Sequence, residues 1–158
     1  MLFIGIDPGL SGAICVLDLN DNIRFVDFTD IDFFESGAWL LEAVEQQKVT
    51  VYLESPSMRP GNARGSDFKA AMNYGQILSS LKCYGFTPIE IRPQDWQKPM
   101  KLKTKSKERK KHKQEIASKV KDRYPEAEIY GPRGGIKDGR SDALGIANHG
   151  KNLFYWSK

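Results

Sequence analysis

The order of the hydrophobic segments is the feature that most restricts how this chain can fold. Three short apolar or alternating runs, at residues 2–7, 12–17 and 23–28, follow one another with only brief turns between them. This pattern predicts an antiparallel meander of three strands. Further along the chain, helical and strand-like patterns alternate, which is typical of parallel strands joined by helices. The whole order therefore predicts an α/β fold in which a mixed sheet is flanked by helices.

The later segments can be assigned from periodicity and from turn residues. Apolar residues at helical spacing predict helices over 35–47 and 67–84. A further helix is expected over about 106–124, where Pro125 ends it, and a last helix opens at 141–147. Short apolar runs predict strands over 49–53 and 87–91. The segment 55–66 is rich in Gly, Pro and Ser and predicts a loop. Because 158 residues is the usual size of one domain, we expect residues 1–158 to form a single domain.

Positive charge is concentrated in one part of the chain. Of the 24 Lys and Arg residues, 12 lie between residues 98 and 123, together with only three acids, although the whole chain carries a net charge of +4. Clustered Lys and Arg residues bind polyanions by releasing counterions from phosphates. The alternative is a basic helix that is merely solvated. The composition leaves both interpretations open.

Four acids occupy positions where chemistry is a reasonable expectation. Asp7 follows an apolar strand, Glu54 ends another, and Asp138 and Asp142 bracket the start of the last helix. An acid at a strand end is often only a cap or a turn former. However, residues four apart share a helix face, so Asp138 and Asp142 can point at one neighbour. Convergent carboxylates without His or Cys ligands suit Mg²⁺, and the basic segment would then hold phosphate.

Three motifs in this order resemble those of a known family. They are I-G-I-D-P-G at 4–9, Y-L-E at 52–54 and D-G-R-S-D-A-L-G-I-A at 138–147, and P-Q-D-W-Q-K at 93–98 supports them. Together they resemble the RuvC-like Holliday junction resolvases of the RNase H superfamily, most closely the short phage-encoded members. The G-I-D-x-G start alone also opens actin-like ATPases. Those proteins need a second phosphate loop, an adenosine motif and a longer chain.

The resemblance implies a fold and an activity. The fold is RNase H-like, with a five-stranded mixed sheet of order 3-2-1-4-5 flanked by helices. The activity is structure-selective endonucleolytic cleavage that resolves four-way DNA junctions by paired, symmetric phosphodiester hydrolysis. Two Mg²⁺ ions per site, or Mn²⁺ in their place, would support that hydrolysis. No nucleotide cofactor is expected.

The resemblance also implies the site residues. The metal ligands and catalytic acids would be Asp7, Glu54, Asp138 and Asp142. Gly139 indicates that Asp138 lies just before the helix, so Asp142 is the firmer assignment. Lys105 is our choice for a side chain that stabilises the scissile phosphate. The residues expected to bind DNA are Arg59, Arg64, Lys103, Lys107, Lys110, Lys111 and Lys113. Trp96 is expected to be a packing anchor.

Partners and location follow from the same reasoning. A four-way junction is nearly two-fold symmetric and one chain has one acidic cluster, so we expect a homodimer. Its interface would be the helix at 67–84, through Phe68, Met72 and Ile77. No run approaches the roughly 18 apolar residues of a membrane span, and the N-terminus lacks signal-peptide features. We therefore expect a protein of the bacterial or phage-infected host cytoplasm without membrane partners.

Other functions remain to be weighed against junction resolution. A less selective RNase H-like nuclease, acting on branched DNA or on RNA–DNA hybrids, is the main alternative. A nucleic-acid-binding domain that has lost its chemistry is a further alternative, but acids in all three motifs argue against it. The residues leave open how strongly the enzyme prefers junctions over flaps or hybrids, and which sequence it cuts.

Overall fold

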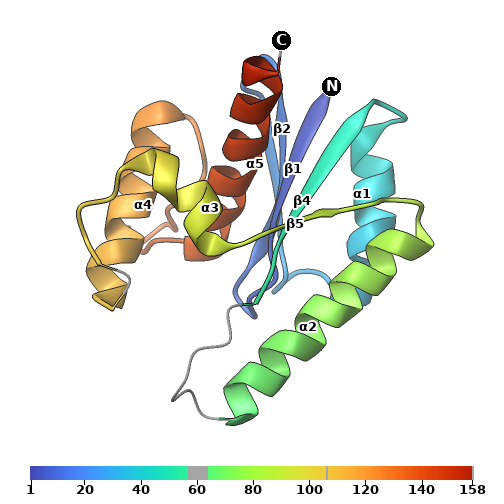
Figure 1. Cartoon of the computed structure of the whole chain (residues 1–158), viewed down its shortest axis with the longest axis horizontal. Helices are drawn as coiled ribbons and strands as arrows, with labels where there is room; N and C mark the ends of the chain where they lie inside the picture. Colours follow the sequence, from blue (N-terminus) through green and yellow to red (C-terminus); the bar gives the residue numbers. More distant parts are fainter. Residues whose placement is uncertain (57–63, 106, 158) are drawn as a thin grey trace.

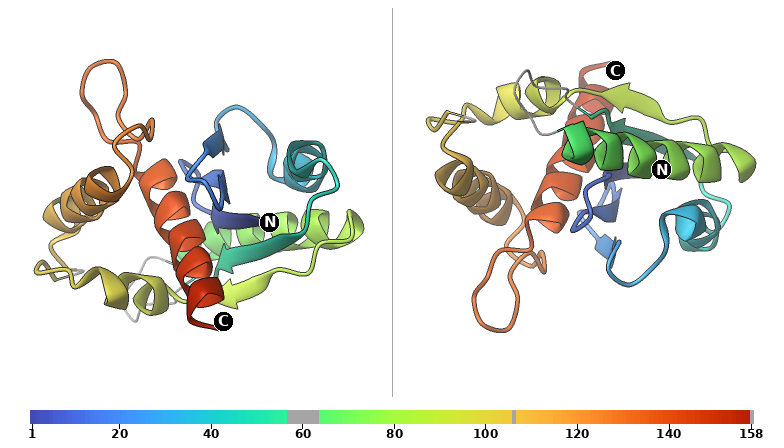
Figure 2. Two further views of the ribbon diagram at one scale, coloured as in Figure 1. Left: turned by 90° about the horizontal axis from the view of Figure 1, so that it is seen from above. Right: turned by 90° about the horizontal axis from the view of Figure 1, so that it is seen from below.

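The computed structural model describes residues 1–56, 64–105 and 107–157 and shows a central sheet with helices on both faces (Figures 1 and 2). The strands are β1 (Leu2–Asp7), β2 (Ala13–Asp18), β3 (Ile23–Asp27), β4 (Val49–Glu54) and β5 (Ile89–Ile91). The α-helices are α1 (Ser36–Val44), α2 (Arg64–Cys83), α3 (Pro93–Gln97), α4 (Arg109–Arg123) and α5 (Asp138–Trp156). Two 3₁₀ helices are η1 (Phe33–Glu35) and η2 (Lys98–Met100). None of the described helices is long and apolar enough to cross a membrane.

The sheet has the expected topology. Its strands are arranged in the order β3-β2-β1-β4-β5. β2 is antiparallel to both β1 and β3, whereas β1, β4 and β5 are parallel to one another. The predicted α/β fold with a mixed sheet of order 3-2-1-4-5 is confirmed. Because β1 and β4 are parallel neighbours, their carboxyl ends lie at the same edge of the sheet, at the lower end in Figure 1.

The central strand β1 separates two hydrophobic layers. Successive side chains of a strand point to opposite faces of the sheet. Ile4 and Ile6 are fully buried in the layer that α1 and α2 cover. Phe3 and Gly5 face α5, and the hydrophobic layer on that side also includes residues of α3 and α4. The strand is therefore buried on both sides, as its nearly continuous apolar sequence indicates.

Two segments differ in detail from the prediction. The segment after β5, to which the sequence pattern assigns no helix, contains α3. Pro93 favours the first turn of this helix, and the Asp95 carboxylate accepts hydrogen bonds from the backbone N–H and the guanidinium of Arg92. The last helix begins at Asp138, so Asp138 lies in the first helical turn rather than before the helix. Gly139 continues the helix, and its lack of a side chain allows α5 to pack against the backbone of Ser11 and Gly12.

One side chain of the predicted dimer interface on α2 lies in the core. Ile77 has no exposed surface and packs in the layer between the sheet, α1 and α2. Its assignment to an interface is wrong, because its position on α2 faces the sheet. Phe68 and Met72 are 66% and 47% exposed, and they lie four residues apart on the N-terminal half of α2. In Figure 1 this half extends beyond the edge of the sheet.

Helix α5 lies directly on β1 because two glycines allow a close approach. A Cβ atom at Gly5 would overlap the carbonyl oxygen of Ala143 on α5. A Cβ atom at Gly139 would overlap the carbonyl oxygen of Ser11, and Gly139 forms an isolated parallel bridge with Gly12. Any larger residue at Gly5 or Gly139 must push the start of α5 away from the sheet. These contacts therefore fix where the first turns of α5 lie.

We predict that Gly5→Ala destabilises the protein by about 1–3 kcal/mol, the usual cost of overpacking a closed core position. Urea unfolding followed by circular dichroism measures the free energy of unfolding. Gly75→Ala is the matched control, because nothing lies within 4 Å of a Cβ at Gly75 in the interior of α2. In Gly75→Ala the free energy of unfolding should increase by roughly 0.5–1 kcal/mol. Equal stability of Gly5→Ala and the wild type would contradict the close packing of α5 on β1.

Candidate active site

The structure brings the four predicted acids to one place. Asp7 is the last residue of β1 and Glu54 the last residue of β4, and these strand ends are adjacent because the strands pair in parallel. Asp138 and Asp142 lie in the first turns of α5, which rests on β1. The charges of Asp7, Glu54 and Asp138 all act on Asp142. The acids thus form one electrostatic cluster drawn from three distant parts of the sequence.

Asp7 lies at the centre of this cluster. Burial raises the pKa of its carboxyl to about 6, and the charge of Asp138 adds to that increase. The backbone N–H of Gly9 donates a hydrogen bond to Asp7 Oδ1 at 3.1 Å and opposes the increase. The Pro-Gly turn after β1 therefore does more than end the strand. It also orients the carboxylate.

Glu54 is held by an aromatic side chain. Burial, followed by the charge of Asp7, raises the pKa of Glu54 to about 7. Trp96 Nε1–H donates a hydrogen bond of 2.7 Å to Glu54 Oε1. Trp96 is 1% exposed, so it is the packing anchor that the sequence predicts. Its second role, orienting Glu54, could not be seen in the sequence because the two residues are 42 positions apart.

Asp142 is the least compensated of the acids. Burial raises the pKa of its carboxyl well above the ordinary value, and the charges of Asp7 and Glu54 increase it further. Its Oδ1 atom is buried and has no hydrogen-bond partner among the described residues. Buried polar atoms usually have a partner, so an unpartnered carboxylate oxygen calls for an explanation. A cation that joins the cluster would supply the missing partner.

A lysine from α4 is the cation that reaches these acids. The Lys113 ammonium forms an ion pair with Asp138. Burial would lower the pKa of Lys113, but the hydrogen bond to Asp138 and the charges of Asp138, Asp142 and Asp7 raise it. The structure does not bring Lys105 to the acids. Lys105 is exposed before α4, and within the described residues its contacts are made by its backbone: its N–H donates to Glu108 Oε2 at 3.4 Å, and its carbonyl accepts from the Glu108 N–H at 2.8 Å.

The donor chemistry of the cluster fits a divalent cation. Its ligands would all be carboxylate oxygens, which Mg²⁺ and Mn²⁺ prefer. No three Asp, Glu, His or Cys side chains of the described residues are spaced to hold a metal ion as they stand. Asp138 is engaged with Lys113, whereas Asp142 carries the unpartnered oxygen. Asp7, Glu54 and Asp142 would therefore have to close around an ion to form a metal centre, and Asp138 lies beside them.

The expected DNA-binding lysines lie on or just before α4. Lys103, Lys107, Lys110 and Lys111 are exposed, and Lys111 is 3.6 Å from Glu108. Arg59 lies outside the described residues. Arg64 begins α2, but the position of its side chain is not among the described features. These four lysines are thus exposed, Lys110 lines a cavity together with Asp138, and Lys113 joins the acidic cluster directly.

Sequence reasoning missed the polar side chains that shape this basic segment. Glu115 accepts hydrogen bonds from the backbone N–H groups of Lys103 (2.7 Å) and Thr104 (2.8 Å), and from the Thr104 hydroxyl (2.6 Å). The backbone bond from Lys103 is the largest cause that lowers the pKa of Glu115 to about 2. His112, expected on a basic face, is half-buried and contacts Thr104 and Gln97. These hydrogen bonds therefore hold residues 103–104, which precede α4, against that helix.

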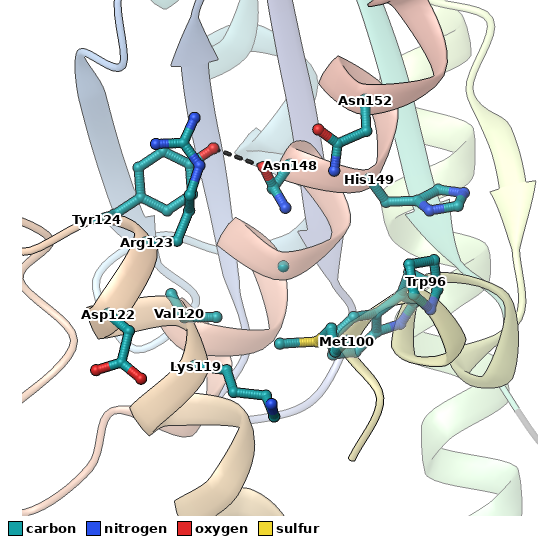
Figure 3. A pocket seen from close by; sticks show the side chains of 12 residues that line it. Trp96, Met100, Lys119, Val120, Asp122, Arg123, Tyr124, Asn148, His149 and Asn152 are labelled. Carbon is teal, nitrogen blue, oxygen red and sulfur yellow. Dashed lines mark hydrogen bonds between the residues drawn. The ribbon is translucent and has the colours of Figure 1, made fainter. Parts of the chain in front are cut away.

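A separate cavity of about 440 Å³ lies between α3, η2, α4 and α5 (Figure 3). Figure 3 shows the hydrogen bond of 2.7 Å from the Tyr124 hydroxyl to Asn148 Oδ1 on its wall. None of the four acids lines this cavity. Trp96 does line it, so one face of this indole borders the cavity while its N–H reaches Glu54. The cavity is therefore distinct from the acidic cluster.

We predict that removing one charge from the cluster stabilises the protein in chelator. The pKa of Glu54 is raised, so between about pH 4 and pH 7 the folded chain binds more protons than the unfolded chain. The free energy of unfolding therefore falls as pH rises through this interval. Glu54→Gln keeps an oxygen acceptor for Trp96 but carries no charge. It should be more stable than the wild type by about 1–3 kcal/mol at pH 8 and nearly equal at pH 5.

Thermal unfolding in chelator at the two pH values measures this difference, and about 1 kcal/mol corresponds to roughly 2–4 °C for a chain of this size. Asp30→Asn, at an exposed acid outside the cluster, is the control and should change neither melting temperature. A Glu54→Gln variant that is less stable than the wild type at pH 8 would show that the cluster is not under electrostatic strain.

Comparisons with known proteins bear on the fold. No protein-family model matches the chain, and no curated protein matches it. The chain is similar to RuvC of T. thermophilus in complex with a Holliday junction substrate, with 18% identity and a TM-score of 0.62 over 99% of this chain and 95% of that one. A second Thermus thermophilus RuvC structure gives 16% identity and a TM-score of 0.57 over 99% and 97% of the two chains. The chain therefore has the RNase H-like fold of RuvC.

Proposed function

We propose that this chain is a structure-selective DNA endonuclease that resolves four-way junctions, a crossover junction endodeoxyribonuclease. One observation carries the proposal: four carboxylates and the Lys113 ammonium converge at the carboxyl ends of β1 and β4. The fold that supports this cluster is that of RuvC, which has been solved with a Holliday junction substrate. The exposed lysines of the segment before α4 and of α4 itself favour a polyanionic substrate.

The activity is proposed to depend on Mg²⁺, or on Mn²⁺ in its place, with two ions per site. Asp7, Glu54 and Asp142 would hold the ions, with Asp138 joining them when Lys113 is drawn toward DNA. Bound divalent ions would supply an activated water molecule and stabilise the charge that develops on the phosphate. The unpartnered oxygen of Asp142 and the raised pKa values of Asp7 and Glu54 support this assignment.

The chain's own groups preorganise the reaction. The Gly9 N–H fixes one carboxylate oxygen of Asp7, and the Trp96 indole N–H fixes one carboxylate oxygen of Glu54. Such fixed hydrogen bonds avoid reorganisation during the reaction. Lys113 holds its ammonium next to the carboxylates, where it can donate to a phosphate oxygen of the bound strand. We therefore assign to Lys113 the stabilising role first given to Lys105.

The surrounding basic residues are proposed to bind the DNA backbone. Contacts to phosphates give affinity and orientation without sequence information. The proposed contacts within the described residues are Lys103, Lys107, Lys110 and Lys111, and Arg59 and Arg64 remain proposals from the sequence. Glu115 fixes the backbone at Lys103, so this part of the basic surface is ordered before DNA binds. Branched DNA in a bacterial or phage-infected cytoplasm is the proposed setting.

We predict that Lys113→Met lowers the rate of junction cleavage in Mg²⁺ by about 100-fold, the usual cost of losing one preorganised charge stabiliser. Junction affinity, measured in Ca²⁺ by fluorescence anisotropy, should change much less. Lys105→Met and Lys111→Met are matched controls on exposed positions. They should weaken affinity modestly, as loss of a phosphate contact does, and leave the cleavage rate of bound junction unchanged. A larger loss of rate in Lys105→Met than in Lys113→Met would restore Lys105 as the catalytic lysine.

We also predict a C2 homodimer, because two opposing strands must be cut and each chain has one acidic cluster. Phe68 and Met72 on α2 are our choice for its interface, since both are exposed. Sedimentation at micromolar concentration should show a species of twice 17.9 kDa. The double variant Phe68→Ser/Met72→Ser should be monomeric and should only nick a supercoiled cruciform that the wild type linearises.

Leu41→Ser on α1 is the control for this experiment, because Leu41 is also an exposed apolar residue but lies on another helix. The Leu41→Ser protein should remain dimeric and should cut two opposing strands of the cruciform. A wild-type protein that is strictly monomeric and only nicks the cruciform would contradict both the dimer and junction resolution.

A further inference from the structure

A second cavity adjoins the acidic cluster and has no assigned role. Its volume is about 560 Å³, and it lies between α4 and the segment that leads into α5. Lys110, Lys113 and Gln114 of α4 line one side. Tyr130, Gly134, Gly135 and Ile136 line the other side, and Asp138 at the start of α5 closes one end. Two of these residues, Lys113 and Asp138, form the ion pair of the candidate active site.

The wall that carries Tyr130 is a small hairpin with fixed geometry. Tyr130 and Ile136 form an antiparallel bridge. The Gly131 N–H donates to the Gly135 carbonyl at 2.7 Å, and the Gly134 N–H donates to the Gly131 carbonyl at 2.9 Å. Gly134 has φ = 74°, which its lack of a side chain permits. Figure 2 shows this hairpin, in orange, standing out beside α4 and the start of α5.

The hairpin presents an aromatic side chain that the rest of the described chain does not use. Tyr130 is 40% exposed. Its ring has no aromatic partner, and its hydroxyl has no hydrogen bond, among the residues that the structure describes. The Gln114 amide across the cavity is likewise without a hydrogen bond in that part of the chain. An exposed aromatic ring on a hydrogen-bonded hairpin lines this cavity together with an amide and two lysines, a combination that is typical of a ligand site.

The two walls match the chemistry of a nucleotide. The Tyr130 ring and the Ile136 side chain offer apolar surface for the face of a base, and stacking of a base on an aromatic side chain strengthens binding by about 5- to 150-fold. Gln114 can hydrogen-bond to a base edge, as glutamine does with adenine. Lys110 and Lys113 can bind the flanking phosphates. Lys113 and Asp138 belong both to this cavity and to the acidic cluster. A base bound in the cavity would therefore be the neighbour, along the DNA strand, of the phosphate at the carboxylates.

We propose that this cavity binds the nucleobase next to the scissile phosphate, and that Tyr130 and Gln114 set the sequence preference of cleavage. Tyr130 stacks on the base and Gln114 reads its edge, while Lys113 holds the intervening phosphate. This inference rests on the proposed nuclease function and extends it from the structure of the DNA to its sequence. Residues outside the acidic cluster would then decide where along a branched DNA the cut falls.

A binding experiment tests the stacking directly. Junctions that carry 2-aminopurine at successive positions around the cut site are bound in Ca²⁺, which separates binding from cleavage. In the wild type, fluorescence should be quenched at one position next to the cut. Tyr130→Phe should keep that quenching, whereas Tyr130→Ala should lose it and should bind the junction about 5- to 150-fold more weakly. Tyr155→Ala, at an exposed tyrosine near the end of α5, is the control and should behave as the wild type.

A cleavage experiment tests the sequence preference. Junctions with randomised bases around the crossover are cut in Mg²⁺, and the cut positions are sequenced. The wild type should prefer particular bases at the cut, whereas Tyr130→Ala and Gln114→Ala should cut with a flatter preference. Unchanged quenching and unchanged preference in Tyr130→Ala, in a wild type that resolves junctions, would overturn this inference and leave the proposed function intact. A wild type that never cuts junctions, but whose quenching depends on Tyr130, would overturn the proposed function and would show that the cavity binds a base without setting a cleavage preference.

Discussion

The direct contact of α5 with β1 at Gly5 determines where the chemistry of this protein can take place. Gly5 lies against the carbonyl of Ala143, so the strand and the helix meet without an intervening side chain. Asp7 follows Gly5 by two residues, and Asp142 immediately precedes Ala143. The contact therefore brings two carboxylates from opposite ends of the chain together. The parallel pairing of β1 with β4 adds Glu54 at the same edge of the sheet.

This arrangement opposes stability and is balanced elsewhere in the fold. Burial raises the pKa values of Asp7, Glu54 and Asp142, which means that the folded state disfavours their charged forms. The chain has placed charge where an apolar core would be more stable, a cost that functional sites commonly carry. Lys113 offsets part of the negative charge, and its helix also carries the exposed lysines. The same helix thereby links the acidic cluster to the surface proposed to bind DNA.

Much of this arrangement could be predicted from the sequence, because it depends on local patterns. Apolar runs that end in Asp7 and Glu54 indicate two strands with acids at their ends, and a spacing of four places Asp138 and Asp142 on one helix face. The sheet order came from the resemblance to resolvases, since strand pairing depends on contacts that periodicity does not show. The identity of the lysine near the acids could not be predicted. The apolar residues Ile116, Ala117 and Val120 show which face of α4 packs on the core, but not which lysine comes near acids from distant parts of the sequence, and the structure selects Lys113.

Long-range contacts account for the other differences. The hydrogen bond from Trp96 to Glu54 and the burial of Ile77 depend on how separate elements pack, not on their own patterns. Lys151 gives a further example: its ammonium is buried and binds the carbonyls of Asp18 and Leu19 and the carboxylate of Asp21. A lysine in a helix is usually expected to be exposed. Lys151 is buried because the turn between β2 and β3 supplies the oxygen atoms that its ammonium binds. Contacts of this kind are visible only once the sheet is assembled.

The central claim is that the carboxylates on β1, β4 and α5 form the active site of a junction-selective nuclease. The most direct test compares initial cleavage rates on a four-way junction, a flap, a duplex and an RNA–DNA hybrid of matched sequence in Mg²⁺, with Asp7→Asn as the blank. We expect the junction to be cut at least about tenfold faster than the others, a difference of ~1.4 kcal/mol in the barrier. The cuts should fall in two opposing strands, and both chelator and Asp7→Asn should abolish them. Equal rates on all branched and hybrid substrates would identify a less selective nuclease, and cleavage by Asp7→Asn at the wild-type rate would contradict the assigned active site.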